Sequence, residues 1–114
     1  MPDLTYENLL KIERPTATVT ISGYEFTLCS VSAVDLDDMI TRHPVRKGSE
    51  AERNGSSWDP AMRYELVSRS LTNIELSTEQ VKELLDNWST GQSEELVNAV
   101  LRLNFRATGA PVPL

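Results

Sequence analysis

Few side chains in this 114-residue sequence have the types and spacing that catalysis or metal binding requires. The single histidine, His43, precedes a proline, and the residues around it specify no catalytic triad, zinc site or general base. Asp35, Asp37 and Asp38 could offer oxygen ligands, but no histidine or cysteine joins them. They also fall at the expected start of a helix, where the helix dipole favours carboxylates. We therefore expect a protein that is not an enzyme and that has no metal or cofactor site.

A basic cluster lies in the polar stretch of residues 43–57, HPVRKGSEAERNGSS. Four of the eleven Lys and Arg residues lie in or beside it: Arg42, Arg46, Lys47 and Arg53. No aromatic residue alternates with them, and the glycines of the stretch do not stand between a strand and a helix as in a phosphate-binding loop. We expect a long loop that is solvated or docks a protein, because loops of this length are usually functional or disordered.

The charge balance and the cysteine count narrow the classes of partner and compartment. A formal net charge of −6 repels nucleic-acid phosphates and anionic lipids, so we expect neither nucleic acid nor membrane as a partner. The single cysteine, Cys29, allows no internal disulfide and is typical of a reducing compartment. Residues 1–10, MPDLTYENLL, carry acids and no long apolar run, which predicts neither a secretory signal nor a membrane span. These features predict a cytoplasmic protein.

The elements that must position these residues begin with a β-hairpin over residues 16–31, TATVTISGYEFTLCSV. This is the only stretch with a strict two-residue hydrophobic period. A two-residue turn at Ser22-Gly23 would place six apolar side chains on one face, in the pairs Ile21 with Tyr24, Val19 with Phe26, and Ala17 with Leu28. A hairpin is marginal alone in water, so its apolar face must be covered by later parts of the chain or by a second chain.

About four helices are expected after the hairpin. Ser32 can cap a helix that runs to residue 41 or 42, because its hydroxyl can accept from free amides of the first turn. A second helix is expected after Trp58, with Asp59 as its cap and Pro60 in its first turn, and to run to about Leu71.

The two later helices carry the clearest patterns. Ser77 and Gln80 fit a capping box, and an apolar stripe follows at Val81, Leu84, Leu85 and Trp88. The last helix is expected to follow Thr90-Gly91 and to end near residues 104–106, with Leu96, Val97, Val100, Leu101 and Phe105 on its apolar side.

The two ends complete a single expected domain of α+β class over residues 1–114. Residues 1–15 form a leader in which Leu4, Tyr6, Leu9, Leu10 and Ile12 could give one or two amphipathic turns. Residues 32–106 form the helical part with its long loop, and the tail 107–114, ATGAPVPL, is expected to be loose because it holds a glycine and two prolines.

The order of these segments resembles that of the small tail assembly chaperones of long-tailed bacteriophages, especially those that infect actinobacteria. The resemblance covers most of the chain from the hairpin onward. The segments that carry it are residues 43–48 (HPVRKG), 76–80 (LSTEQ), 84–88 (LLDNW), 89–92 (STGQ) and Leu103-Asn104. None of these segments is chemically unique, and the resemblance lies in their order and spacing.

This resemblance implies a non-enzymatic role in tail morphogenesis in the host cell cytoplasm. Chaperones of this family keep the long tape measure protein soluble, help to bring the major tail protein to it, and are usually absent from the mature virion. The family often makes a longer form by ribosomal frameshifting near the end of the reading frame. A free hairpin edge and amphipathic helices suit such a role, and the free edge also leaves homo-oligomers open.

Seven residues are our candidates for partner contact: the loop residues Arg46, Lys47 and Arg53, the loop-edge Trp58, and Leu96, Val100 and Phe105 of the last helix. The alternative for each apolar one is a place in the core. Two other functions stay open at this point. The chain could be a small structural virion protein, such as a tail completion or head–tail connector component, or a small regulatory adaptor that binds a host enzyme or nucleic acid.

Overall fold

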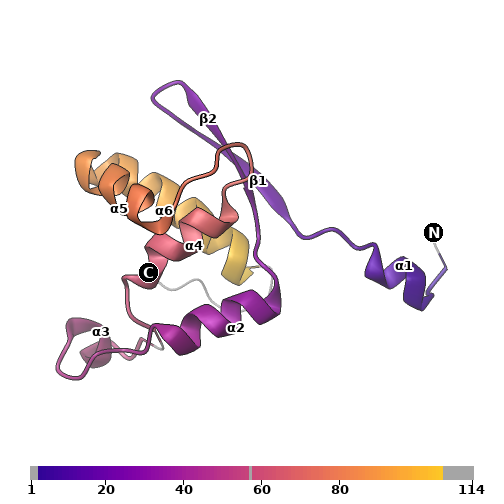
Figure 1. The fold of residues 1–114 in the computed structure, drawn as a ribbon, viewed down its shortest axis with the longest axis horizontal. Helices are drawn as coiled ribbons and strands as arrows, with labels where there is room; N and C mark the ends of the chain where they lie inside the picture. Colours follow the sequence, from indigo (N-terminus) through magenta and orange to yellow (C-terminus); the bar gives the residue numbers. More distant parts are fainter. Residues whose placement is uncertain (1–2, 57, 107–114) are drawn as a thin grey trace.

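The computed structural model describes residues 3–56 and 58–106, and it has the expected α+β class (Figure 1). One two-stranded antiparallel sheet and six helices make up this part of the chain. The elements are α1 (Tyr6–Leu10), β1 (Thr16–Ile21), β2 (Tyr24–Cys29), α2 (Ala33–Arg42), α3 (Glu50–Arg53), α4 (Met62–Ser70), α5 (Thr78–Asn87) and α6 (Thr90–Arg106). Five of these helices follow the hairpin, so the expected count of about four was too low; the additional one is α3, a short helix of four residues. Helix α1, of five residues, lies in the leader, where one or two helical turns were expected. The expected loose tail, residues 107–114, lies outside the described residues.

The hairpin has the predicted register. Its pairs run from Ile21 with Tyr24 beside the turn to Thr16 with Cys29 at the open end. Both turn residues have positive φ, 52° at Ser22 and 85° at Gly23, as a type I′ turn requires. The alternation therefore sets the register, and glycine at the second turn position adopts the left-handed conformation without steric cost.

The two edges of the hairpin differ. The outer edge of β2 is paired by the segment after α4, because the Thr72 amide donates to the Thr27 carbonyl oxygen at 2.9 Å. The Asn73 side chain accepts from the Thr27 amide at 3.1 Å and donates to the Glu25 carbonyl at 2.9 Å. On β1, the outward backbone groups of Thr16, Thr18 and Thr20 make no such bond to any other described residue. The β1 edge is thus open toward this part of the chain.

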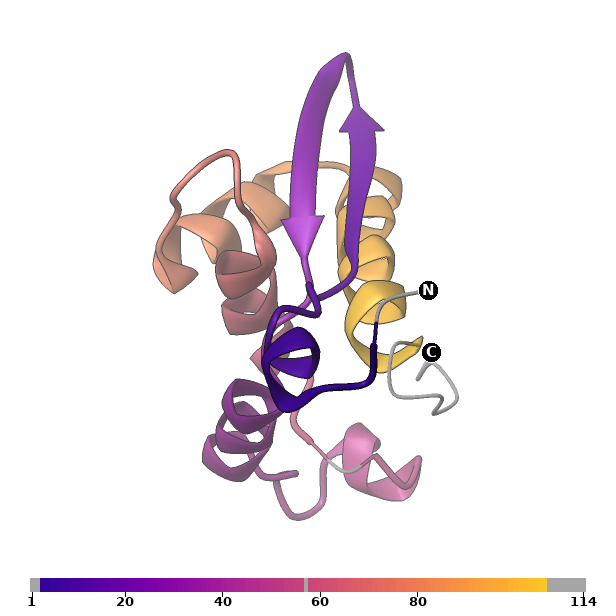
Figure 2. The same cartoon turned by 90° about the vertical axis from the view of Figure 1, so that its right-hand side faces the viewer.

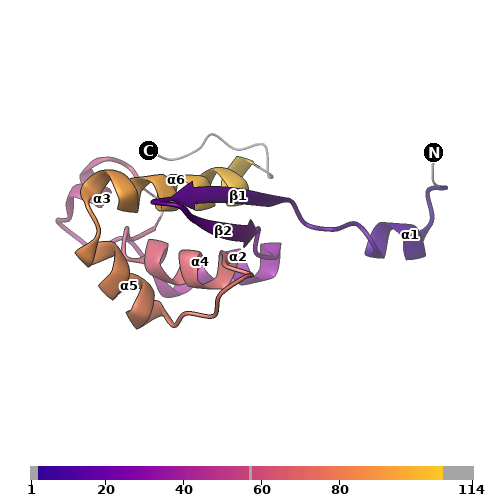
Figure 3. The ribbon, with the colours of Figure 1, turned by 90° about the horizontal axis from the view of Figure 1, so that it is seen from above.

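The helices cover one face of the hairpin, as expected. Figure 3 shows α6 running along β1, with α4 and α5 on the β2 side. The core gathers Ile21 and Leu28 of the hairpin with residues of α2, α4, α5 and α6, among them Leu36, Met39, Met62, Leu66, Val81, Leu85, Leu96 and Val100. Tyr24 departs from the predicted face burial, because it lies beside the turn and 73% of it is exposed.

Local capping explains where most helices begin. Ser32 caps α2, and Ser77 and Gln80 form the predicted capping box of α5. A second reciprocal pair, which the sequence reading missed, opens α6: the Gln92 amide donates to the Ser89 hydroxyl at 3.3 Å, and the Gln92 side chain accepts from the Ser89 amide at 3.1 Å. These caps satisfy amides that a helix N-terminus leaves free.

Two local predictions between α2 and α4 need correction. Helix α4 begins at Met62, two residues after Pro60, where the helix was expected to begin. The Asp59 carboxylate accepts from the Ala61 amide, and the Asp59 carbonyl oxygen accepts from the Met62 amide, so Asp59 holds a turn that leads into the helix. The expected loop of residues 43–57 contains α3, whose first turn is capped by Ser49. Four residues after a serine cap were enough for one turn of helix there.

Asn104 joins three elements at the end of α6. Its side-chain oxygen accepts from the Val31 amide, just after β2, at 2.8 Å. Its side-chain nitrogen donates to the Ser70 hydroxyl at 3.1 Å and to the Val100 carbonyl at 2.9 Å. Because Asn104 and Ser70 are buried, these bonds satisfy polar groups in the core and fix α6 against the hairpin exit and α4.

Candidate partner-binding surfaces

A buried carboxylate, Glu65 of α4, organises the charged side of the molecule. The Arg42 guanidinium binds it with two hydrogen bonds, one to Oε2 and one of 2.8 Å to Oε1. Arg69 donates to Oε2 at 2.9 Å, and Nε2 of His43 lies 2.9 Å from Oε1. Arg42 also pairs with Asp38 at 2.9 Å. We call these five residues the Glu65 cluster.

The partners of Glu65 change its ionisation. The hydrogen bonds from Arg42 lower the pKa of the Glu65 carboxyl to about 2, against the opposing effect of burial, and His43 and Arg69 act in the same direction as Arg42. The Arg42 pKa is raised, first by Glu65 and then by Asp38. His43 therefore does have a carboxylate beside it, which the sequence could not show because Glu65 is 22 residues away. The cluster is an ion-pair network in which Glu65 and Asp38 pair with the cations around them.

The basic loop is also tied down by local bonds. Arg46 donates to the Asp59 carboxylate at 2.8 Å, and Arg53 donates to the Gly48 carbonyl oxygen at 2.9 Å. The Ala61 amide, and then Arg46, lower the pKa of Asp59, which is buried. Lys47 is exposed on the same loop. Two of the three predicted loop contacts thus hold the loop in place, while their exposed surfaces remain accessible.

The predicted aromatic and apolar contacts fall into two groups. Trp58 and Phe105 are half-buried and stack on each other, with ring centroids 6.0 Å apart and an angle of 6° between the planes. Leu96 and Val100 lie in the core at 3% and 1% exposure. A partner can touch the edges of the aromatic pair, but it cannot reach Leu96 or Val100 in the folded chain. The partner-binding role of the seven residues stays a prediction.

Most of the exposed large apolar side chains of the described residues lie on the N-terminal arm, residues 3–14. It carries five exposed large apolar side chains: Leu4 (87%), Tyr6 (75%), Leu9 (49%), Leu10 (67%) and Ile12 (70%). Helix α1 projects away from the body of the protein (Figures 1 and 3). An isolated helix of five residues is not stable in water by itself, so the exposed apolar side chains of the arm are the feature of this segment that calls for an explanation.

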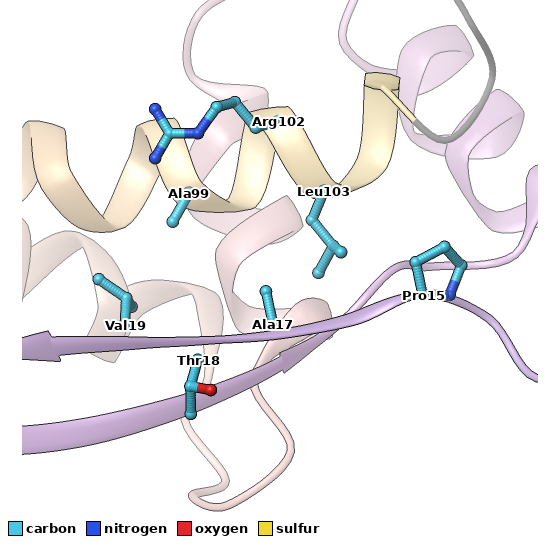
Figure 4. A pocket seen from close by; sticks show the side chains of 7 residues that line it. All are labelled: Pro15, Ala17, Thr18, Val19, Ala99, Arg102 and Leu103. Atoms are coloured by element: carbon cyan, nitrogen blue, oxygen red, sulfur yellow. The ribbon is translucent and has the colours of Figure 1, made fainter.

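A groove of about 410 Å³ lies between β1 and α6 (Figure 4). Ala17 and Val19 point toward it from the strand, and Ala99 and Leu103 point toward it from the helix. The remaining lining residues are Pro15, Thr18 and Arg102, and Figure 4 shows the Arg102 guanidinium on the side of α6 that faces away from β1. Because alanines stand on both walls, strand and helix leave space between them at the open edge of β1.

Sequence reasoning missed both the arm and the groove as surfaces. A signal for the arm was present in the sequence. Five large apolar residues fall within nine positions, and no other segment was expected to cover them. The groove had no such signal, since Ala17 and Ala99 meet only in the folded chain. Within the described residues, no three His, Cys, Asp or Glu side chains gather in a way that could hold a metal ion. None of the described helices has the length and apolar character needed to cross a membrane.

Comparison with known proteins adds no relative. No protein-family model matches the chain, and it matches no curated protein and no solved structure.

Proposed function

We propose that this chain is a non-enzymatic chaperone of tail assembly in a long-tailed bacteriophage. It binds the tape measure protein in the host cytoplasm, keeps it soluble until the tail forms, and is absent from the mature virion. The major tail protein is a further partner under this proposal. The resemblance of residues 43–48 and 76–92 to such chaperones supports the identity of the partner.

The observation that carries the proposal is the exposed apolar arm. A protein that holds an aggregation-prone partner needs accessible apolar side chains together with enough charge to stay soluble itself. The arm supplies the first with side chains such as Leu4 and Leu10, and a net charge of −6 supplies the second. The partner would lay the apolar face of a helix against the arm, as amphipathic helices do in other recognition modes.

The test is co-expression of the full chain with the tape measure protein of the same phage. We expect the tape measure protein to become soluble and to co-purify with the chain. The variant Leu9→Asp/Leu10→Asp should lose this effect, because two carboxylates interrupt the apolar surface. Val34→Asp is the matched control, since Val34 is also an exposed apolar helix residue, at 77%, and lies outside the arm.

Three results would count against the proposal. The tape measure protein could stay insoluble, the double variant could work as well as the natural chain, or the chain could be recovered from purified virions. The last result would favour a structural virion protein.

A further inference from the structure

The arm and the groove are complementary in chemistry. The arm, residues 3–14, has five exposed apolar side chains and three carboxylates, at Asp3, Glu7 and Glu13, against two cations, Lys11 and Arg14. The groove has apolar walls, and the exposed Arg102 is among its lining residues. The groove could therefore cover apolar side chains of the arm, and Arg102 could pair with its carboxylates.

The root of the arm is fixed in a direction away from its own groove. The Ser30 amide donates to the Pro15 carbonyl oxygen at 3.0 Å, and the Arg14 side chain donates to the Ser30 carbonyl oxygen at 2.8 Å. Pro15 is at once the last residue before β1 and the end wall of the groove. The arm thus starts at the groove and points outward from it, as Figure 3 shows for α1.

We propose that the groove between β1 and α6 binds the N-terminal arm of a second copy of this chain, so that two copies exchange arms. Because each arm begins beside its own groove, a two-fold axis near Pro15 would bring each arm to the other copy's groove. Exchange of an identical segment is a low-cost route to a dimer, and a proline in the connecting segment is compatible with it. The Arg102 guanidinium then meets the carboxylates of the incoming arm.

The position of α6 favours a lone segment over pairing of two β1 edges. Figures 2 and 3 show α6 on the β1 side of the hairpin, along the open edge. A symmetric pairing of two β1 strands would bring two α6 helices to the same side of the new sheet, beside strands separated by only ~4.8 Å. A single segment brings no helix of that kind with it, and it can lie in the groove with its apolar side chains between Val19 and Leu103.

The first measurement is the molar mass of the full chain by size-exclusion chromatography with light scattering, over a range of concentrations. We expect a dimer that dissociates on dilution. Leu9→Asp/Leu10→Asp and Arg102→Glu should both move the equilibrium to monomer, whereas Val34→Asp should leave it unchanged. Circular dichroism checks that each variant is folded. A monomer at every concentration, or a dimer that persists in the double variant, would overturn the inference.

Disulfide cross-linking distinguishes exchange of arms between two copies from an arm that folds back onto the groove of its own chain. In a Cys29→Ser background, one preparation carries Leu10→Cys in the arm and another carries Arg102→Cys at the groove. After mixing and mild oxidation, we expect a covalent dimer of the two different chains, and none when Val34→Cys replaces Leu10→Cys. Both cysteines placed in one chain could instead give a cross-linked monomer at high dilution. That monomer, without the mixed dimer, would show that the arm folds onto its own groove and would overturn the exchange.

These measurements need no client protein, so they are separate from the test of the proposed function. The tape measure protein and the groove of a second copy would compete for the same arm. If the chain dimerises but does not solubilise the tape measure protein, the exchange stands and the chaperone proposal fails. If the chain solubilises the tape measure protein but is a monomer at every concentration, the chaperone proposal stands and the exchange fails.

Discussion

The Glu65 cluster and the N-terminal arm differ in whether groups that are costly in their surroundings are satisfied within the chain. The cluster buries a carboxylate and surrounds it with cations, so that a costly group is satisfied from within. The arm exposes large apolar side chains that nothing in the described chain covers. The buried charges of the cluster serve the stability of the fold, because they are paired within the chain. The surface that stays uncovered in the described chain is apolar, so a search for a binding surface would begin at the arm.

The largest effect should come from breaking the cluster. Glu65→Gln removes the buried carboxylate that Arg42, His43 and Arg69 contact, although Arg42 keeps Asp38 as a second partner. We expect the free energy of unfolding to fall by about 2–4 kcal/mol. Urea denaturation followed by circular dichroism measures this. Glu79→Gln is the control, because Glu79 is an exposed residue of α5 and should change stability by less than about 0.5 kcal/mol. Equal stability of the two variants would mean that the cluster is not a structural element.

A smaller effect should appear as a pH dependence. The pKa of the Glu65 carboxyl is about 2 in the folded chain, below its ordinary value of 4.5, so its contribution to stability is complete above about pH 4.5. It is lost as the pH falls toward 2, because the unfolded state then binds the proton first. We expect about 2–3 kcal/mol of stability to be lost in this pH window. The loss is smaller than the full difference in pKa implies, because the arginine partners are partly exposed and solvent screens their interaction with Glu65. Asp59, whose pKa is also lowered, acts in the same direction.

The check is urea denaturation of the natural chain and of Glu65→Gln at several pH values between 5 and 2. The difference in stability between the two proteins should shrink as the pH falls. A difference that stays constant would show that the Glu65 carboxyl is not held ionised by its partners.

The smallest effect on stability should come from the arm. Leu9 and Leu10 contribute no buried residue to the core, so Leu9→Asp/Leu10→Asp should change the free energy of unfolding of the monomer by less than about 0.5 kcal/mol. The measurement is urea denaturation at a concentration where the chain is monomeric. A large loss would place the arm among the structural elements and remove its contrast with the cluster.

Local rules predicted more of the fold than of the surfaces. The hairpin register and the cap of α5 follow from residues close in sequence, so alternation and the Ser77–Gln80 pair were enough. The late start of α4 was not predictable, because Asp59 also depends on Arg46 and on the His43 carbonyl in the fold. Sequence reading likewise identified apolar faces but could not tell which of their residues are buried. Leu96 and Val100 were therefore proposed as contacts although they lie in the core.

The hydrogen bonds of Asn104 have a consequence for the order in which the chain is made. A ribosome releases the hairpin early, but its exit at Val31 is fixed by a residue 73 positions later, near the end of α6. Until that helix has left the ribosome, Leu28 of the hairpin and Val67 of α4 lack part of their cover, and the nascent chain has an incomplete core. Its final folding step is therefore expected after synthesis of α6, and any factor that protects the nascent chain would act before that moment.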